Sequence, residues 1–202
     1  MVCLGSPSPD LDAWIHTRIA KAHALSLDSA AINGTGNTNQ PLGLLGTTGI
    51  GSVAIGTNGG DPTSDIINAL EAGVALANGD DATMGFLTNS TMRSRLRKTS
   101  VLTSIYSGVP LWVDGKLLDT PAAVSNQIPA NLVKGTSSDC SAIICGAWDQ
   151  LLIGEFNGAL EIISDPYALA KQGMLEISSF AMYDCVVLQP AAFAVCADAR
   201  NV

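Results

Sequence analysis

The side chains that most often carry out chemistry are few in this chain, and their spacing does not bring them together. The two histidines, His16 and His23, lie seven positions apart in a predicted helix, whereas side chains that meet on a helix are three or four positions apart. A nucleophilic serine or cysteine needs a base beside it, and the sequence contains no G-x-S-x-G elbow. The sequence therefore predicts no catalytic residues and favours a protein that is not an enzyme.

Cysteines and carboxylates are the other candidates for chemistry. The cysteines form no C-x-x-C pair, and they number five: Cys3, Cys140, Cys145, Cys185 and Cys196. Together with the histidines they lack the spacing of a metal site. Because the start of the chain has no secretory leader, we expect reduced thiols, mostly buried in strands. The sequence predicts no metal and no cofactor.

A glycine-rich stretch at residues 49–54, GIGSVA, formally matches the dinucleotide fingerprint GxGxx(G/A). That motif must open a helix, so that the pyrophosphate meets backbone N–H groups at the positive end of the helix. Here the stretch continues instead into a predicted loop at residues 55–62. A small α/β domain that binds a ligand at this turn is therefore kept only as an alternative function.

A second glycine-rich stretch, NGTGNTNQPLGLLG at residues 33–46, separates a predicted helix from the rest of the chain. Two of its glycines permit positive φ or close backbone approach. Its proline stops the helix and biases the preceding residue towards an extended conformation. We interpret it as a structural hinge, whose residues are Gly34, Gly36, Gln40, Pro41 and Gly43.

Periodicity predicts three helices and a series of strands. Residues 11–32 form the longest helix, because apolar residues recur at about every third or fourth position: Ile15, Ile19, Ala22, Leu25 and Leu27. Shorter helices follow, capped by Thr63 or Ser64 and by Asn89 or Ser90. Strands are predicted at residues 83–87, 140–146, 151–155, 160–164, 174–180 and 186–196, with turns at Asn157-Gly158 and Asp165-Pro166.

The third predicted helix is unusually basic. It carries four of the ten basic residues of the chain: Arg93, Arg95, Arg97 and Lys98. Solvated surface is one interpretation. The other is a subunit or phosphate contact, because arginine forks suit carboxylates and phosphates.

Composition bounds the class of protein. The chain has 202 residues, of which 47% are hydrophobic and only 14% charged, against about 25% charged in typical globular domains. Apolar surface of this extent favours self-association. The formal net charge of −8 argues against a dedicated nucleic-acid binder. No apolar run approaches the roughly 20 residues of a membrane span, so we expect no membrane partner.

The order of the motifs is more specific than any one of them. A helix ends in a glycine-rich turn and QPLGLL; MGFLTNSTMRSRLRK, a PAAVS stretch, the buried strand CSAIICG and VVLQPAAFAV follow. This succession, over residues 11–197, resembles the major capsid proteins of tailed double-stranded-DNA bacteriophages. Their HK-ninety-seven-like fold is shared with encapsulin shells.

The resemblance implies an α+β fold in two parts. Residues 11–45 and 147–202 would form a peripheral domain, in which a long spine helix lies on an antiparallel sheet of long strands from residues 160–196. Residues 46–146 would form a mixed α/β axial domain, and residues 1–10 an unstructured lead-in. Family members carry an arm and an extended loop ahead of the spine helix. This chain therefore resembles an N-terminally short, truncated or processed member.

The resemblance also implies a function. The chain would be a non-enzymatic shell subunit that assembles with copies of itself into pentamers and hexamers and encloses double-stranded DNA without specific contacts. Other virion proteins would be further partners. The protein would be made in the bacterial cytoplasm and reside in the virion capsid. An encapsulin-like protein shell is the alternative within the same fold.

Overall fold

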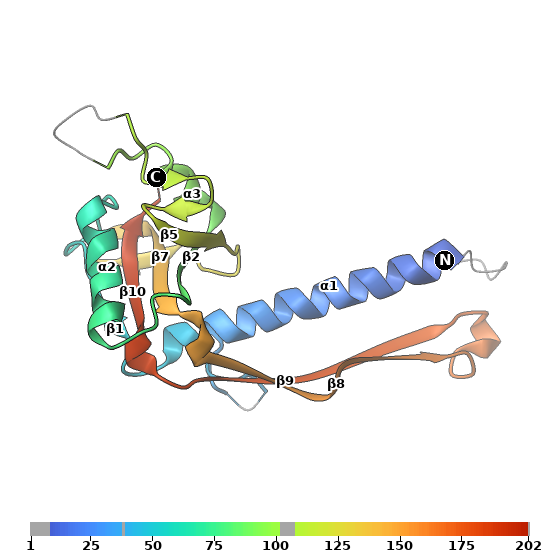
Figure 1. The fold of residues 1–202 in the computed structure, drawn as a ribbon. Helices are drawn as coiled ribbons and strands as arrows, with labels where there is room; N and C mark the ends of the chain where they lie inside the picture. The colour runs from blue at the N-terminus through green and yellow to red at the C-terminus, as the bar shows by residue number, and fades with distance from the viewer. Residues whose placement is uncertain (1–8, 38, 102–107, 202) are drawn as a thin grey trace.

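The computed structural model describes residues 9–37, 39–101 and 108–201. It consists of a compact body and an arm that extends from one end of the body (Figure 1). The arm is made of the long helix α1 (Pro9–Asn33) and of a two-stranded ribbon, β8 (Leu151–Asp165) with β9 (Glu176–Val187). The loop between these two strands contains the 3-10 helix η3 (Ala170–Gln172), and the remaining helices and strands of the described residues form the body.

The body is built on one mixed sheet with the order β1-β10-β7-β2-β5-β4-β3. Strand β7 is antiparallel to both of its neighbours in this order, β10 and β2, whereas β2 and β5 run parallel. A short strand, β6, pairs with the first part of β7. The strands are β1 (Gly51–Ser52), β2 (Met84–Thr88), β3 (Trp112–Val113), β4 (Lys116–Leu117), β5 (Thr120–Val124), β6 (Leu132–Lys134), β7 (Ser137–Ala147) and β10 (Phe193–Arg200).

Two hydrophobic cores hold this sheet. Helices α2 (Ser64–Leu76) and α3 (Ser90–Leu96) contribute Ile67, Leu70, Met92 and Leu96 to the first core, which includes Ile143 of β7. The second core includes the neighbouring Ile144 and joins the sheet to the end of α1 and to the 3-10 helix η1 (Leu44–Gly46). Neighbouring residues of a strand point to opposite faces, so the continuous apolar run of β7 fits a strand that is covered on both faces.

The arm is a thin structure. Over residues 13–28 of α1 the partly buried positions are Ile15, Ile19, His23 and Leu27, which form a single stripe at four-residue spacing. This stripe faces the ribbon, where His23 Nε2 lies 2.9 Å from Ser179 Oγ. Two residues expected on the inner face, Ala22 and Leu25, are exposed instead. A flat two-stranded ribbon covers only one narrow strip of a helix.

Three sequence predictions about strands are corrected. Asn157-Gly158 does not end a strand, because β8 runs through it and absorbs it as a register shift between Phe156 and Glu161. Likewise, residues 176–187 belong to one strand, β9, after a loop that contains the 3-10 helix η3 (Ala170–Gln172). The stretch 186–196 is not one strand, since β9 ends at Val187 and the 3-10 helix η4 (Pro190–Ala192) precedes β10.

The placement of β10 also differs from the expectation. The resemblance had grouped it with the long strands, but β10 pairs with β7 and β1 inside the body. Long-range pairing decides this, since Phe193 lies opposite Gly146 and its ring occupies the space that a side chain at Gly146 would need. At the other end of the chain, α1 begins at Pro9, inside the expected lead-in, and residues 1–8 lie outside the described residues.

Candidate functional site

The predicted hinge at residues 33–46 is a tightly closed loop. Backbone hydrogen bonds join Gly43 N to Gly34 O at 2.9 Å and Gly36 N to Pro41 O at 3.2 Å. The side chain of Gln40 closes the tip, because its Oε1 accepts a hydrogen bond from Thr35 Oγ1 at 3.2 Å. The predicted hinge residues therefore come together in one small structure, which connects the end of α1 to the body.

Glycine is required at three of these positions. A Cβ at Gly34 would overlap the carbonyl oxygens of Ala30 and Pro41, and a Cβ at Gly43 would overlap Gly34 N. Gly36 has a φ of +69°, a conformation that residues with a Cβ rarely adopt. Close backbone packing at Gly34 and Gly43 and the positive φ of Gly36 account for glycine at these three positions.

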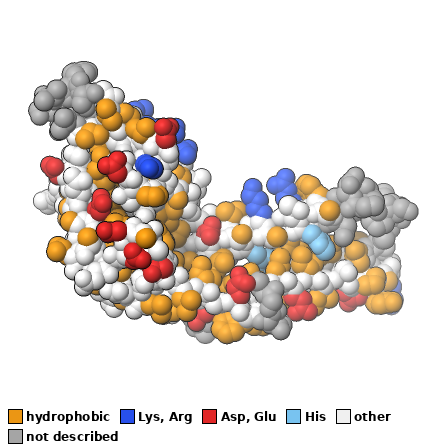
Figure 2. Space-filling view, in the orientation of Figure 1, with side chains coloured by type: hydrophobic (Ala, Val, Ile, Leu, Met, Phe, Trp, Pro, Cys, Tyr) orange, Lys and Arg blue, Asp and Glu red, His pale blue; other side chains and the backbone are white. Residues whose placement is uncertain are grey.

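The outer face of the ribbon carries several large exposed hydrophobic side chains, together with the exposed carboxylates of Glu161 and Asp184, and the sequence analysis did not identify it. Directly paired residues of β8 and β9 point to the same side, and Ser179 faces α1, so the alternate positions face away from it. Hydrophobic side chains lie along the arm in Figure 2. Those of the outer face are 45–62% exposed: Leu152, Phe156, Ile163, Phe180, Met182 and Val186. The alternating spacing of these residues was present in the sequence.

The basic residues of α3 fall into two groups. Arg95 forms an intrachain ion pair with Asp61, in which Nη2 lies 2.9 Å from Oδ1. Within the described residues, Arg93, Arg97 and Lys98 have no acidic side chain at salt-bridge distance. Helix α3 itself is fixed by Asn89, whose side chain accepts a hydrogen bond from Met92 N at 2.8 Å and so caps the helix as expected. We name Arg93 and the C-cap residue Arg97, which lie four positions apart on one side of the helix, the α3 basic face.

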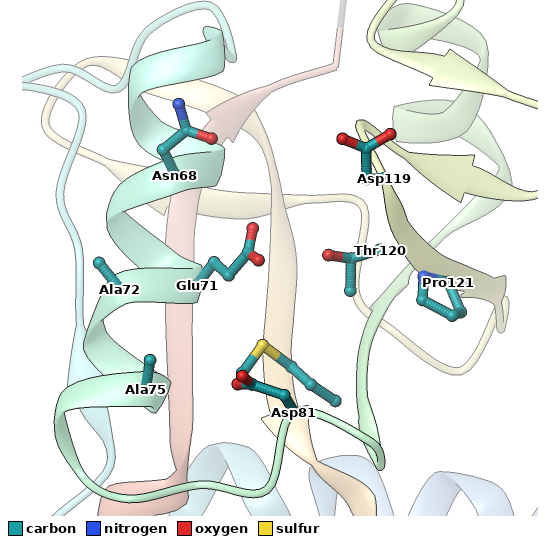
Figure 3. Close-up of a pocket in the computed structure, with 9 residues that line it drawn as sticks. Asn68, Glu71, Ala72, Ala75, Asp81, Asp119, Thr120 and Pro121 are labelled. Atoms are coloured by element: carbon teal, nitrogen blue, oxygen red, sulfur yellow. The ribbon is translucent and has the colours of Figure 1, made fainter.

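A groove of about 630 Å³ lies between α2 and the start of β5. Three carboxylates reach into it from different elements, and Figure 3 shows Glu71, Asp81 and Asp119 around the open space. The other polar groups of the lining are Asn68 and Thr120, and its apolar part is Ala72, Ala75, Met84 and Pro121. We name this the acidic groove. Its carboxylates are far apart in the sequence, so no local motif indicated it.

The described residues contain no group of histidine, cysteine and acidic side chains that could hold a metal ion. The turn at residues 49–54 contributes the two-residue strand β1, and the next helix, α2, begins only at Ser64. That turn therefore does not open a helix.

Burial raises the pKa of the Cys145 and Cys196 thiols to about 12, which disfavours the reactive thiolate.

A buried carboxylate that the sequence analysis did not identify organises the loop before α2. Asp198 is 3% exposed and accepts hydrogen bonds from Ile55 N, at 3.0 Å to Oδ2, and from Gly56 N at 3.5 Å. The Cys196 thiol donates to its Oδ1 at 3.2 Å. All the partners of Asp198 belong to the fold itself, so its role is structural.

None of the helices in the described chain is both long and apolar enough to cross a membrane.

The prominent features of this chain are an arm with exposed apolar side chains, a hydrogen-bonded loop that connects the arm to the body, and two oppositely charged surfaces. These features define a class of proteins that associate through their surfaces. The model of the phage capsid family matches residues 4–198. The chain therefore belongs to the phage capsid family, as the order of its motifs predicted. It is 27% identical over 189 residues to the major capsid protein of Halomonas phage phiHAP-1. That match covers 93% of this chain and only 29% of the phage protein.

Solved structures confirm the capsid fold. The capsid of a native GTA particle matches with a TM-score of 0.71 at 22% identity, over 96% of this chain and 68% of that one. The holo-SrpI encapsulin complex of Synechococcus elongatus PCC 7942 matches with a TM-score of 0.66 at 17% identity, over 98% of this chain and 69% of that one. At these identities the likeness shows the fold alone. It is the α+β capsid fold that the resemblance implied, with a long helix on an antiparallel sheet.

Proposed function

We propose that this chain is a non-enzymatic structural subunit that forms the wall of an icosahedral phage or prophage-derived capsid and assembles with copies of itself around double-stranded DNA. Its family membership supports the class of function. In this proposal the arm is the peripheral part of the subunit and the body, including β10, is the axial part. The protein is made in the bacterial cytoplasm and resides in the virion, where other virion proteins are further partners.

The exposed outer face of the ribbon is the observation that carries this proposal. An isolated pair of strands is marginally stable in water, and here α1 covers only one side of the ribbon. The other side exposes large apolar side chains along both strands, such as Phe156 at 57% and Met182 at 62%. Obligate protein interfaces are rich in such residues. Burial against other copies would stabilise the arm and the shell together.

The test is whether self-association depends on this face. Phe156 and Met182 lie directly opposite each other in the ribbon, and replacing both with threonine removes apolar surface while keeping residues that favour strands. We expect sedimentation velocity and negative-stain microscopy to show rings or shells for the parent chain and mainly monomers for Phe156→Thr with Met182→Thr. The control is Val133→Thr, at a residue of the body that is 73% exposed.

The control variant should assemble as the parent chain does. A parent chain that stays monomeric at high concentration and at every salt concentration would contradict self-association. Equal association of the ribbon variant and the control would instead contradict the role of the ribbon.

An encapsulin-like shell is the second candidate function, supported by the structural likeness to an encapsulin complex. The two functions differ in what the shell encloses. Nuclease-protected DNA inside purified particles would support the capsid, whereas a co-purifying protein without protected DNA would support the encapsulin-like shell.

A further inference from the structure

The acidic groove carries negative charge that is not neutralised within the chain. Its carboxylates are those of Glu71, Asp81 and Asp119 (Figure 3). In the described part of the chain no lysine or arginine lies within salt-bridge distance of them, and the lining contains none. Carboxylates gathered in a concave surface focus a negative potential and attract cations. At about 630 Å³ the groove has room for several side chains, since pockets for drug-sized ligands span about 300–1,000 Å³.

The α3 basic face cannot be the intrachain partner of this groove, for a geometric reason. Arg93 and Arg97 each lie two positions from Arg95, which places them about 160° around the helix from it at about 3.6 residues per turn. Arg95 points to Asp61, next to the beginning of α2. Arg93 and Arg97 therefore face away from α2 and from the groove beside it.

We propose that the α3 basic face of one copy docks in the acidic groove of the next copy. The inference rests on the proposed function, in which copies associate, and names a pair of surfaces that would meet. Both surfaces are fixed by the folded body. Met92 and Leu96 of α3 are fully buried, and Glu71 and Asn68 extend from α2, whose inner side packs in the same core.

The contact is head-to-tail, because each copy offers two different surfaces that face different ways. Interfaces of this kind close into rings when the rotation between copies allows it. The arginine side chains can form paired hydrogen bonds with the carboxylates. Charge pairs of this kind set the register and the rate of association and weaken in salt.

Charge reversal tests the pairing. Arg97→Glu changes the basic face and Glu71→Lys changes the groove, and each should weaken association on the order of tenfold in sedimentation equilibrium at low salt. The two changes in one chain should recover much of the loss, because opposite charges face each other again. Lys134→Glu is the matched control, since Lys134 is an exposed residue of β6 that lies outside both surfaces. It should associate as the parent chain does, and circular dichroism should show that every variant is folded.

A cross-link gives an independent measurement. Ser94 is exposed on α3 and Ala75 is exposed in the groove, so we expect a mixture of Ser94→Cys chains and Ala75→Cys chains to form a disulfide-linked dimer under mild oxidation. Copies that associate normally through the ribbon, but show neither a charge-reversal effect nor this dimer, would overturn the pairing alone. A parent chain that never associates would overturn the proposed function itself.

Discussion

Replacing Gly34 with alanine tests whether the loop at residues 33–46 is held closed by backbone packing. An alanine Cβ would overlap the carbonyl oxygens of Ala30 and Pro41 and would lie 3.1 Å from Gly43 N. All three contacts are backbone atoms, which cannot rotate away as the end of a flexible side chain can. The loop must therefore open, or the end of α1 must shift from the second core.

The expected cost follows from these contacts. Forcing an extra methyl into a well-packed site costs about 1–3 kcal/mol. Opening the loop would also break the backbone hydrogen bonds from Gly43 N to Gly34 O and from Gly36 N to Pro41 O, each of which stabilises the fold by about 1 kcal/mol net. We expect Gly34→Ala to lower the free energy of unfolding by about 4 kcal/mol, the sum of both effects.

A matched control separates this overlap from backbone strain. Gly173 has a φ of +63°, and a Cβ there would meet no atom within 4 Å, so Gly173→Ala should cost only about 1–2 kcal/mol for its left-handed conformation. Urea unfolding followed by tryptophan fluorescence measures both variants, with Trp148 reporting on the core next to the loop. A Gly34→Ala cost equal to or below that of Gly173→Ala would refute the close packing of the loop.

Two further predictions concern buried groups of the body. Asp198→Ala leaves the backbone N–H groups of Ile55 and Gly56 without their acceptor, so it should lower the free energy of unfolding by about 3 kcal/mol and speed hydrogen exchange at both amides. Asp198→Asn keeps an acceptor oxygen and should therefore lower the free energy of unfolding by less. An equal loss of stability in the two variants would contradict this role of Asp198. Burial raises the pKa of the Cys145 and Cys196 thiols from 9.0 to about 12, so their stabilising contribution is complete below pH 9 and is lost as pH rises towards 12. Between pH 8 and pH 10 the two thiols should lower the free energy of unfolding by about 3 kcal/mol in total, and a double Cys→Ala variant with the same pH dependence in urea unfolding would contradict this.

Local sequence patterns predicted which segments form helices and strands better than they predicted which of these elements pair or pack together. The run CSAIICG indicated a buried strand, and β7 is one, because both faces of its sheet are covered. The period of α1 predicted a helix, but the side that packs is Ile15, Ile19, His23 and Leu27. Which side packs depends on the ribbon, and the ribbon comes more than a hundred residues later.

Pairing across long distances accounts for the remaining errors. Asn157-Gly158 has strong turn chemistry, yet pairing along β9 on both sides of it keeps β8 in one strand. Similarly, Phe193 fills the space beside Gly146, and this contact places β10 in the body. The acidic groove combines carboxylates of α2, of the segment before β2 and of the turn before β5, so its formation could be seen only after folding.

Because α1 is long, a small rotation at the loop at its end produces a large displacement at the far end of the arm. A helix of 25 residues is about 37 Å long at about 1.5 Å per residue, and the ribbon runs beside it for most of that distance (Figure 1). A rotation of about 5° at Gly34 would therefore move the far end of the arm by about 3 Å, which is comparable to a whole hydrogen-bond length. Small angular differences at a few glycines would then be amplified into differences of curvature in any surface that these arms tile.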